Sequence, residues 1–401
     1  MAHDPMSPPW SDLQPELVGL VFLRLPTRAD RGRFPAICRQ WRYTVQQGHL
    51  PLPSPLPWLV LPDGSVFRVP HGETFHLPEG TRYHNSCGEW LIMSRDDDSC
   101  FLLNAFTKVT MPLPSLSSYC PFDEPVETVN VRNIGRESHG TWMDLKDKDY
   151  ISVNALVVCS TQLIAALVAV GAGNLGTVAL CRPGAAAWSV NAHEQCRWLS
   201  GMVFFQGKLY AIDAGTEDLL AIDIVDEHDN ATPRVSRIES IIRRFELRSH
   251  SYFIQRTYLL ECHGTLLIIR RRLSCRGETL PVFGSRSSVA VAGWNEFEVF
   301  EADFGHFSWA KVKTLGNDLA LFIGKGCSRA VSVSPYDLSR DCIFFLDDYF
   351  DSWKVTSTSC SVYDMKEGKV YSPLPVAPWK SGNVPATWLF SQGKTDMLQK
   401  T

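Results

Sequence analysis

The 401-residue sequence lacks an excess of charge of either sign. It holds 39 Lys and Arg residues against 43 Asp and Glu residues, for a formal net charge of −4. A surface that binds nucleic acid or an anionic membrane needs a larger imbalance, so neither partner is expected. Hydrophobic residues make up 45% of the chain and charged residues 20%, a composition that favours a globular protein over a disordered one.

A secretory leader is also missing from the start of the sequence. Residues 1–10 are polar and rich in proline, with neither a basic beginning nor an apolar stretch. The 12 cysteines are scattered and include no C-x-x-C pair. We therefore expect free, mostly buried thiols in a reducing intracellular compartment, the cytoplasm or the nucleus, between which no basic run decides.

Long hydrophobic runs are scarce. The uncharged stretch from Ser152 to Cys181 is the main candidate, but Asn154 and the polar Ser160-Thr161-Gln162 interrupt it. A membrane span needs about 20 predominantly apolar residues. The stretch therefore predicts two buried strands joined by a turn at Ser160–Gln162, and no membrane partner.

Signals for chemistry are weak. Gly171-Ala172-Gly173-Asn174-Leu175-Gly176 matches G-x-G-x-x-G, but Pro183-Gly184 follow where a dinucleotide site needs a helix, so we interpret the glycines as a hairpin turn. The acidic clusters 96–98 and 347–351 lack calcium-loop spacing, and neither a zinc-ligand set nor G-x-S-x-G is present. No cofactor, metal or catalytic residue is expected, and the chain is predicted not to be an enzyme.

The first fifty residues predict a helix with two hydrophobic stripes. Pro15 and Glu16 suit a first turn after a cap at Asp12, and Pro26 ends the helix after Leu25. A module of roughly forty residues cannot bury both stripes by itself, so another part of the chain or another protein must cover one. The stripes are Leu13, Leu17, Leu20 and Val21, and Val18, Phe22 and Leu25; a later helical segment carries Ile37, Cys38, Trp41 and Val45.

This pattern, continued by Asp30 and Cys38-Arg39-Gln40-Trp41-Arg42, resembles an F-box. An F-box is the module through which substrate receptors bind the Skp-type adaptor of a cullin–RING ubiquitin ligase. Gln14 replaces a proline of the family pattern, and Pro35 falls where the family continues a helix. Proline costs about 3 kcal/mol inside a helix, so either a helix boundary falls at Pro35 or the F-box is weakened. The resemblance implies adaptor contacts by Leu13, Pro15, Glu16, Leu17, Leu20, Val21, Leu25 and Trp41.

Proline also marks the expected domain boundaries. The segment 48–57 contains four prolines, which favour a semi-rigid extended linker. We therefore expect an F-box-like helical module over residues 8–47, a β-domain over 58–390 and a flexible tail over 391–401.

Residues 58–390 predict a mainly β fold. Short β-rich runs alternate with tight turns such as Gln206-Gly207-Lys208 and His263-Gly264, and Val235–Leu247 is the best helix candidate. A degenerate unit recurs every 40–50 residues or so, which predicts a β-propeller of roughly six to eight blades, with a pair of β-sandwiches as the alternative. The units are 101–114, 178–190, 203–225, 259–273, 297–312 and 343–375.

Two residue clusters receive structural interpretations. Arg270-Arg271-Arg272 is the strongest basic cluster, and we interpret it as a solvated strand end, with a patch for an acidic partner as the alternative. The tryptophans are expected mainly between blades, although one on a rim would suit partner binding. They are Trp188, Trp309, Trp353, Trp379 and Trp388.

Four blocks resemble a plant F-box family with a C-terminal KIB-type β-propeller. They are "LLNAFTKVTMPLPSL", "VALCRPGAAAWSV", "FEADFGHFSWAKVKTLGNDLALFIGKGCSRAVSVS" and "RDCIFFLDD". The resemblance implies the substrate-recognition subunit of an SCF-type E3 ubiquitin ligase, whose propeller binds an unidentified target protein.

Two alternatives stay open at this point. The propeller could bind a small molecule or act as an enzyme, with the N-terminal helices purely structural, or the F-box could have lost the adaptor. A helix 13–25 that is exposed and separate from the β-domain favours the receptor. The same helix buried against the β-domain favours the small-molecule binder or enzyme.

Overall fold

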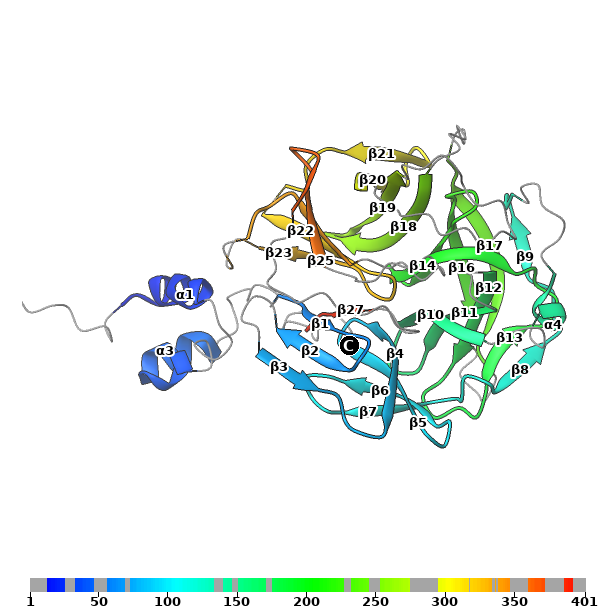
Figure 1. Cartoon of the computed structure of the whole chain (residues 1–401), viewed down its shortest axis with the longest axis horizontal. Helices are drawn as coiled ribbons and strands as arrows, with labels where there is room; N and C mark the ends of the chain where they lie inside the picture. The colour runs from blue at the N-terminus through cyan, green and yellow to red at the C-terminus, as the bar shows by residue number, and fades with distance from the viewer. Residues whose placement is uncertain are drawn as a thin grey trace, which may run out of the picture.

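A computed structural model shows a small helical module beside a large β-domain (Figure 1). The structure describes residues 13–25, 33–46, 56–68, 73–132, 140–145, 151–170, 175–226, 232–244, 253–274, 295–316, 318–333, 336, 338–346, 360–371 and 386–391.

The helical module consists of α1 (Pro15–Arg24), the 3₁₀ turn η2 (Phe34–Ala36) and α3 (Arg39–Gln46). Gln14, rather than the expected Asp12, occupies the N-cap of α1, and Pro15 fills the first helical turn. The helix ends at Arg24, and Leu25 is extended before Pro26, as the sequence predicts. Pro35 lies within η2, so a helix boundary falls at this residue and no long helix has to accommodate it.

The described residues of the β-domain form five hydrogen-bonded sheets, and the ten-stranded one comprises two blades, so we number six blades in chain order. Blade 1 consists of β27 (Thr387–Leu389), β1 (Trp58–Val60), β2 (Ser65–Arg68) and β3 (Glu73–His76). Blade 2 consists of β4 (Thr81–Cys87), β5 (Trp90–Arg95), β6 (Cys100–Asn104) and β7 (Thr110–Leu113). Blade 3 consists of β10 (Ile151–Val158), β11 (Ile164–Val170), β12 (Leu175–Cys181) and β13 (Trp188–Asn191), with β8 (Tyr119–Phe122) added in parallel.

The remaining three blades follow along the chain. Blade 4 consists of β14 (Arg197–Phe205), β15 (Lys208–Asp213), β16 (Leu219–Val225) and β17 (Arg234–Ile242), with β9 (Glu127–Val129) added in parallel. Blade 5 consists of β18 (Phe253–Cys262), β19 (Thr265–Ser274), β20 (Asn295–Asp303) and β21 (Ser308–Val312). Blade 6 has the order β23 (Arg329–Ser332), β22 (Leu319–Ile323), β24 (Cys342–Leu346), β25 (Cys360–Asp364) and β26 (Lys369–Tyr371).

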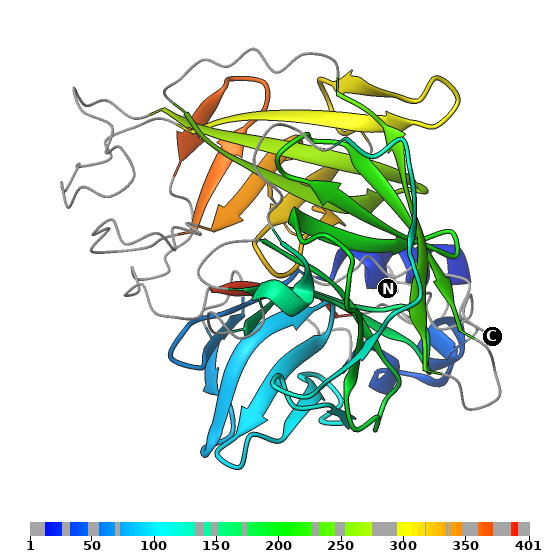
Figure 2. The same cartoon turned by 90° about the vertical axis from the view of Figure 1, so that its right-hand side faces the viewer.

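These blades form a closed ring. The inner strands β4, β10, β14, β18 and β23 neighbour one another in that order, and β27 lies beside β4. Six hydrophobic clusters fill the spaces between neighbouring blades, and one of them joins blade 6 to blade 1 through Phe322 and Trp388. Figure 2 shows the sheets arranged around this ring from the side. The expected β-propeller is therefore confirmed, with six blades described.

Tight turns between strands lie where the sequence predicts them. Gln206 and Gly207 both have positive φ, at +47° and +80°, in the hairpin between β14 and β15. That backbone matches the right-handed twist of the strands, and glycine adopts it without a steric penalty. The turn at Ser160–Gln162 also lies between the strands β10 and β11, so the interpretation of the uncharged stretch as strands is confirmed.

Two expectations about the β-domain are wrong. The best helix candidate, Val235–Leu247, is the strand β17 as far as Ile242, and half-buried and buried residues alternate over most of that strand. The units 259–273 and 297–312 belong to a single blade, because each covers only one hairpin of a four-stranded sheet. The segment Gly171–Asn174, interpreted as a turn, lies outside the described residues.

Candidate functional site

The helical module presents an apolar face to solvent. Val18 and Phe22 are buried in its core with Phe34 and Trp41. On the other side of α1, Leu17, Leu20 and Val21 are 45%, 53% and 38% exposed. One of the two hydrophobic stripes thus fills the module, and most of the other is uncovered among the described residues.

The core of the module is separate from the propeller. Phe34 stacks on Trp41 with ring centroids 4.2 Å apart, and Leu13 and Leu25 pack against the edge of this core. Within the described chain, this cluster contains no residue of the β-domain. The exposed face of α1 is therefore not a surface that the propeller needs for its own packing, which favours the receptor interpretation over purely structural helices.

The sequence-predicted contact residues divide into four groups. Pro15, Leu17, Leu20 and Val21 are exposed, and Leu13 and Leu25 are partly buried. The side chain of Glu16 lies outside the described part of the chain. Trp41 is only 6% exposed, so its expected place on the contact surface is corrected to a place in the core.

Two exposed apolar residues of the module were not predicted. Ile37 is 61% exposed and Tyr43 is 64% exposed, next to η2 and on α3 respectively. The sequence placed Ile37 on the same stripe as Trp41, but the chain reaches α3 only after Ile37, so the helical spacing does not include it. No pattern in the sequence marked Tyr43 as an exposed residue of the module.

A cavity of about 230 Å³ lies among the inner strands of the propeller. Its walls include Leu156, Met202, Tyr258 and Leu260, and residues 324–328 also line it. The Ser200 and Thr257 hydroxyls, 2.6 Å apart, join blades 4 and 5 beside it. Ligand sites usually measure about 300–1,000 Å³ and combine apolar walls with a few convergent polar groups. This cavity is smaller, so it gives the small-molecule alternative little support.

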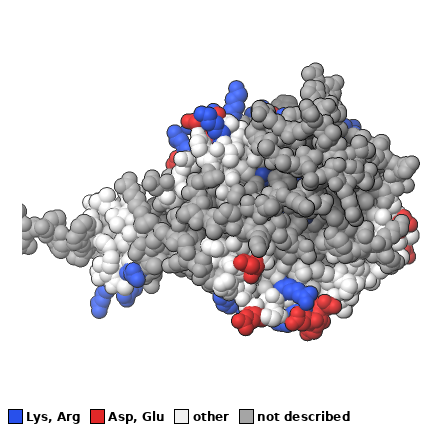
Figure 3. Space-filling model, viewed as in Figure 1, with Lys and Arg blue, Asp and Glu red and all other residues white. Residues whose placement is uncertain are grey.

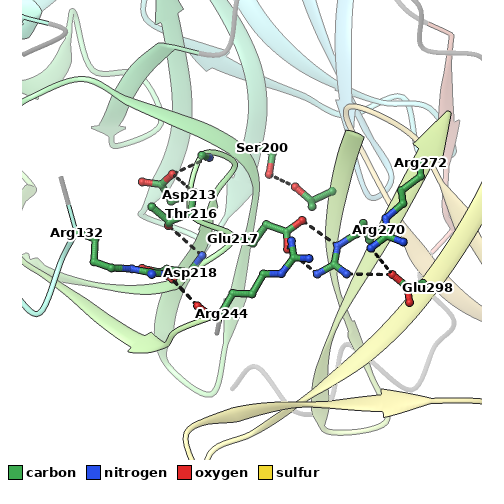
Figure 4. A network of polar contacts seen from close by, with 12 residues as sticks. Arg132, Ser200, Asp213, Thr216, Glu217, Asp218, Arg244, Arg270, Arg272 and Glu298 are labelled. Carbon is green, nitrogen blue, oxygen red and sulfur yellow. Dashed lines mark hydrogen bonds and ion pairs between the residues drawn. The ribbon is translucent and has the colours of Figure 1, made fainter. Parts of the chain in front are cut away.

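The arginine cluster expected at a solvated strand end is instead a buried network (Figure 4). Arg270 is 6% exposed, and its Nε donates to Glu217 Oε1 at 2.9 Å, while Nη1 donates to Glu298 Oε2 at 3.0 Å. Arg244 also pairs with Glu217. Arg271 is 4% exposed and donates to the Leu346 carbonyl at 2.9 Å. The solvated-end interpretation is therefore wrong for these residues.

The same network extends across blade 4. Arg132 pairs with the buried Asp218 through both Nε, at 3.0 Å, and Nη2. Asp218 also accepts from the Arg244 backbone amide at 3.3 Å. Because bidentate arginine–carboxylate pairs fix orientation, the network ties blade 4 to blade 5.

Cysteines in the described chain are free, as expected. Burial raises the pKa of the Cys262 and Cys342 thiols to about 11. Because the thiolate is the reactive form, these cysteines are inert at neutral pH. Trp188 and Trp388 are fully buried between blades, as expected, and Trp309 is partly buried. Trp353 and Trp379 lie outside the described residues.

Comparison with known proteins assigns the β-domain. A family model described as the KIB1-4 beta-propeller matches residues 59–367, well over half of the chain. The chain belongs to the KIB1-4 beta-propeller family.

One relative of this KIB1-4 protein is named as an F-box protein. The F-box protein SKIP23 of Arabidopsis thaliana is 23% identical over 416 residues, which cover 92% of this chain and 95% of that protein. The sequence resemblance to plant F-box proteins with a KIB propeller is thus confirmed. None of the helices in the described ranges is long and apolar enough to cross a membrane.

Solved structures show more distant likeness. A quinonprotein alcohol dehydrogenase-like protein from Bacteroides thetaiotaomicron is 11% identical with a TM-score of 0.34, covering 83% of this chain and 78% of that one. An ancestral GH74 enzyme is 10% identical with a TM-score of 0.27, covering 84% of this chain and 40% of its own. At these scores the likeness carries no functional argument.

Proposed function

We propose that this protein is the substrate receptor of an SCF-type cullin–RING ubiquitin ligase. The helical module binds a Skp-type adaptor, and the propeller holds a target protein so that a ubiquitin-loaded enzyme of the same complex reaches its lysines. The receptor itself supplies effective concentration and orientation, not bond chemistry. Its free cysteines suit a reducing intracellular compartment.

The observation that carries this proposal is the exposed face of α1. Leu17, Leu20 and Val21 present apolar surface on a module whose core is already complete. Neighbouring exposed apolar side chains usually mark an interaction site. The similarity to an F-box protein over most of both chains supports an adaptor as the partner.

Co-purification with the adaptor tests the proposal. The full chain is co-expressed with a Skp-type adaptor, beside a variant with Leu17→Asp and Leu20→Asp. Each aspartate places a charge in an apolar contact, so we expect the affinity to fall by about 3 kcal/mol or more, roughly a hundredfold in Kd. Size-exclusion chromatography and titration calorimetry measure the complex.

Phe307→Asp is the matched control, because Phe307 is 61% exposed on a propeller turn. It places one such charge at an exposed apolar position but should leave adaptor binding unchanged. A folded, monomeric wild-type chain that ignores the adaptor would overturn the proposal. Equal losses in the α1 variant and in Phe307→Asp would show that the α1 face is not the contact.

A further inference from the structure

Lysine is absent from the first 107 residues of the chain. Lys108 is the first lysine, and the nine basic residues before it are all arginine. The rest of the chain contains 13 lysines and 17 arginines. The lysine-free region, residues 1–107, contains the helical module, the linker, three of the four strands of blade 1 and most of blade 2.

Folding requires arginine at some basic positions of this protein but not at others. A planar guanidinium is needed where it forms a bidentate or stacked contact, whereas lysine serves equally well for a solvated charge. The buried cation Arg270 meets the first condition. Exposed cations of later blades are often lysine, and Lys208, Lys311, Lys366 and Lys369 have side chains 51–70% exposed.

In the lysine-free region, exposed basic residues are arginine even where no contact requires a guanidinium. Arg39 is exposed on α3, and Arg82 is 73% exposed with a 3.4 Å contact to Asp96. Lysine would serve at either position. Arg42 and Arg95 do use the guanidinium, through a bond to the Pro35 carbonyl and a stack over Phe101. Blue side chains on the helical module in Figure 3 are therefore all arginines, although packing does not require this of Arg39.

The difference between arginine and lysine matters in ubiquitin transfer. The lysine ε-amine attacks the thioester carbonyl of the ubiquitin-loaded enzyme, an amide bond forms, the enzyme's cysteine thiolate leaves, and the amine releases a proton. Arginine stays protonated at neutral pH and cannot act as this nucleophile. A lysine in the module would be held at a fixed place in the ligase, and such fixed groups react at high effective concentration.

We propose that the lysine-free region protects the receptor from ubiquitination by its own ligase, and that self-modification is confined to lysines from Lys108 onward. This inference rests on the proposed function. It concerns the regulation of the receptor's lifetime rather than the choice of target.

Arginine-to-lysine variants of the full chain test the inference. Arg39→Lys and Arg82→Lys keep the charge and add an amine. Arg340→Lys is the control, because Arg340 is 63% exposed in blade 6, a region that already contains lysines. Each protein is first checked for adaptor co-purification and then incubated with a reconstituted cullin–RING ligase, its ubiquitin-loaded enzyme and ubiquitin. Self-modification is followed by its rate and by mass-spectrometric mapping of modified lysines.

We expect Arg39→Lys and Arg82→Lys to bind adaptor like wild type, to be modified several-fold faster, and to carry ubiquitin on the new lysine. Arg340→Lys should change the rate little. Adaptor-bound variants that are modified at the wild-type rate, with no ubiquitin at position 39 or 82, would overturn the inference.

Arg39→Gln and Arg82→Gln separate the added amine from any disturbance of the fold. They should be modified at the wild-type rate, and acceleration in them would also overturn the inference. A wild-type chain that fails to bind the adaptor is a different result, because it removes the proposed function itself and this inference with it.

Discussion

Glu217 combines an unusual backbone conformation with a buried charge. Its φ is +54°, in the left-handed region that disfavours residues other than glycine, and its side chain is 1% exposed. The bonds from Arg270 and Arg244 offset this strain. A buried ion pair need not stabilise a fold relative to apolar residues, but the loss of one partner leaves the other charge uncompensated.

Glu217→Gln is therefore expected to lower the free energy of unfolding by about 3–5 kcal/mol. Glutamine keeps the shape of the side chain, removes the charge and replaces one acceptor oxygen with an NH2 donor. Urea denaturation measures the change. Glu367→Gln is the control, because Glu367 is 54% exposed and lies 3.5 Å from Lys369. Surface pairs contribute about 0–1 kcal/mol, so similar losses in the two variants would contradict the structural role of the network.

His84 makes stability depend on pH. Burial and the neighbouring Arg82 lower the pKa of His84 below the ordinary histidine value of 6.5. Below pH 6.5 the unfolded chain therefore binds a proton at His84 that the folded chain does not bind. The free energy of unfolding consequently rises with pH between the folded pKa and pH 6.5. The contribution is complete above pH 6.5 and is lost as pH falls from there towards the folded pKa.

We expect His84→Gln to reduce the acid-induced drop in melting temperature between about pH 7.5 and pH 5.5. Glutamine can still bond Ser94, which lies 2.7 Å from His84 Nε2. His263→Asn, at an exposed turn with φ +49°, is the control and should retain the wild-type drop. A drop in His84→Gln as large as in wild type would show that other groups cause it.

Residue-scale partners were the least predictable part of the molecule. The sequence marks Arg270 and Arg271 as a basic run but contains no signal that Glu217 lies beside Arg270, because 53 positions separate them. Only the packing of blade 4 against blade 5 brings them together. A charged run on a strand is more often solvated, so the ordinary interpretation failed at an interface that the sequence does not reveal.

At the scale of elements, the helical module illustrates both success and failure. The two stripes of α1 and the stop at Pro26 follow directly from spacing and from the geometry of proline. Which stripe is buried was not decided by the sequence, because both are apolar. The position of Phe34 determines which stripe is buried. Its ring centroid lies 5.1 Å from that of Phe22 and 4.2 Å from that of Trp41.

Trp41→Ala is predicted to unfold the module without unfolding the propeller. Trp-to-Ala changes in a core cost about 3–5 kcal/mol, which exceeds what a module of this size can lose. Hydrogen exchange should show loss of protection in α1 and α3 alone, together with loss of adaptor binding. Tyr43→Ala, at an exposed position of the same helix, should leave protection intact. If Trp41→Ala stays protected yet loses the adaptor, Trp41 contacts the adaptor directly.

The strand β17 shows why the best helix candidate in the sequence is a strand. Its sequence "RVSRIESII" has apolar residues at spacings that suit a helix as well as a strand. Pairing decides the outcome, because β16 offers a complementary edge over seven residues and β9 pairs on the other side. Such tertiary context overrides weak local preference, and β-branched Val and Ile fit a strand better.

At the scale of the whole molecule, the propeller class was predictable and its blade boundaries were not. Hairpin turns recur in the sequence with glycine where positive φ is needed, which identifies strand pairs. Each blade, however, contains two hairpins, and nothing in a degenerate repeat says where a blade begins. The closure of the ring also cannot be predicted from local sequence. The strands β27 and β1 are more than 300 residues apart and pair through Leu59 and Trp388.

Ring closure should depend on Trp388. Its side chain is fully buried, its indole Nε1 donates to the Ile323 carbonyl at 3.1 Å, and its ring meets Phe322 edge-on at 5.2 Å. These contacts join β27 to blade 6, while β1 continues the sheet on the other side. Removing the side chain empties the space between the first and last blades of the ring.

We expect Trp388→Ala to destabilise the whole propeller by about 3–5 kcal/mol, and Trp388→Phe to cost less because the ring volume is partly kept. Urea denaturation followed by circular dichroism measures the loss. A chain ending at Ser391, which retains all of β27, should match wild type, whereas a chain ending at residue 385 should open the ring. Because every blade packs on two neighbours, we expect opening to lower the unfolding midpoint of all six blades together. Loss confined to blades 1 and 6 would instead show that the blades fold independently.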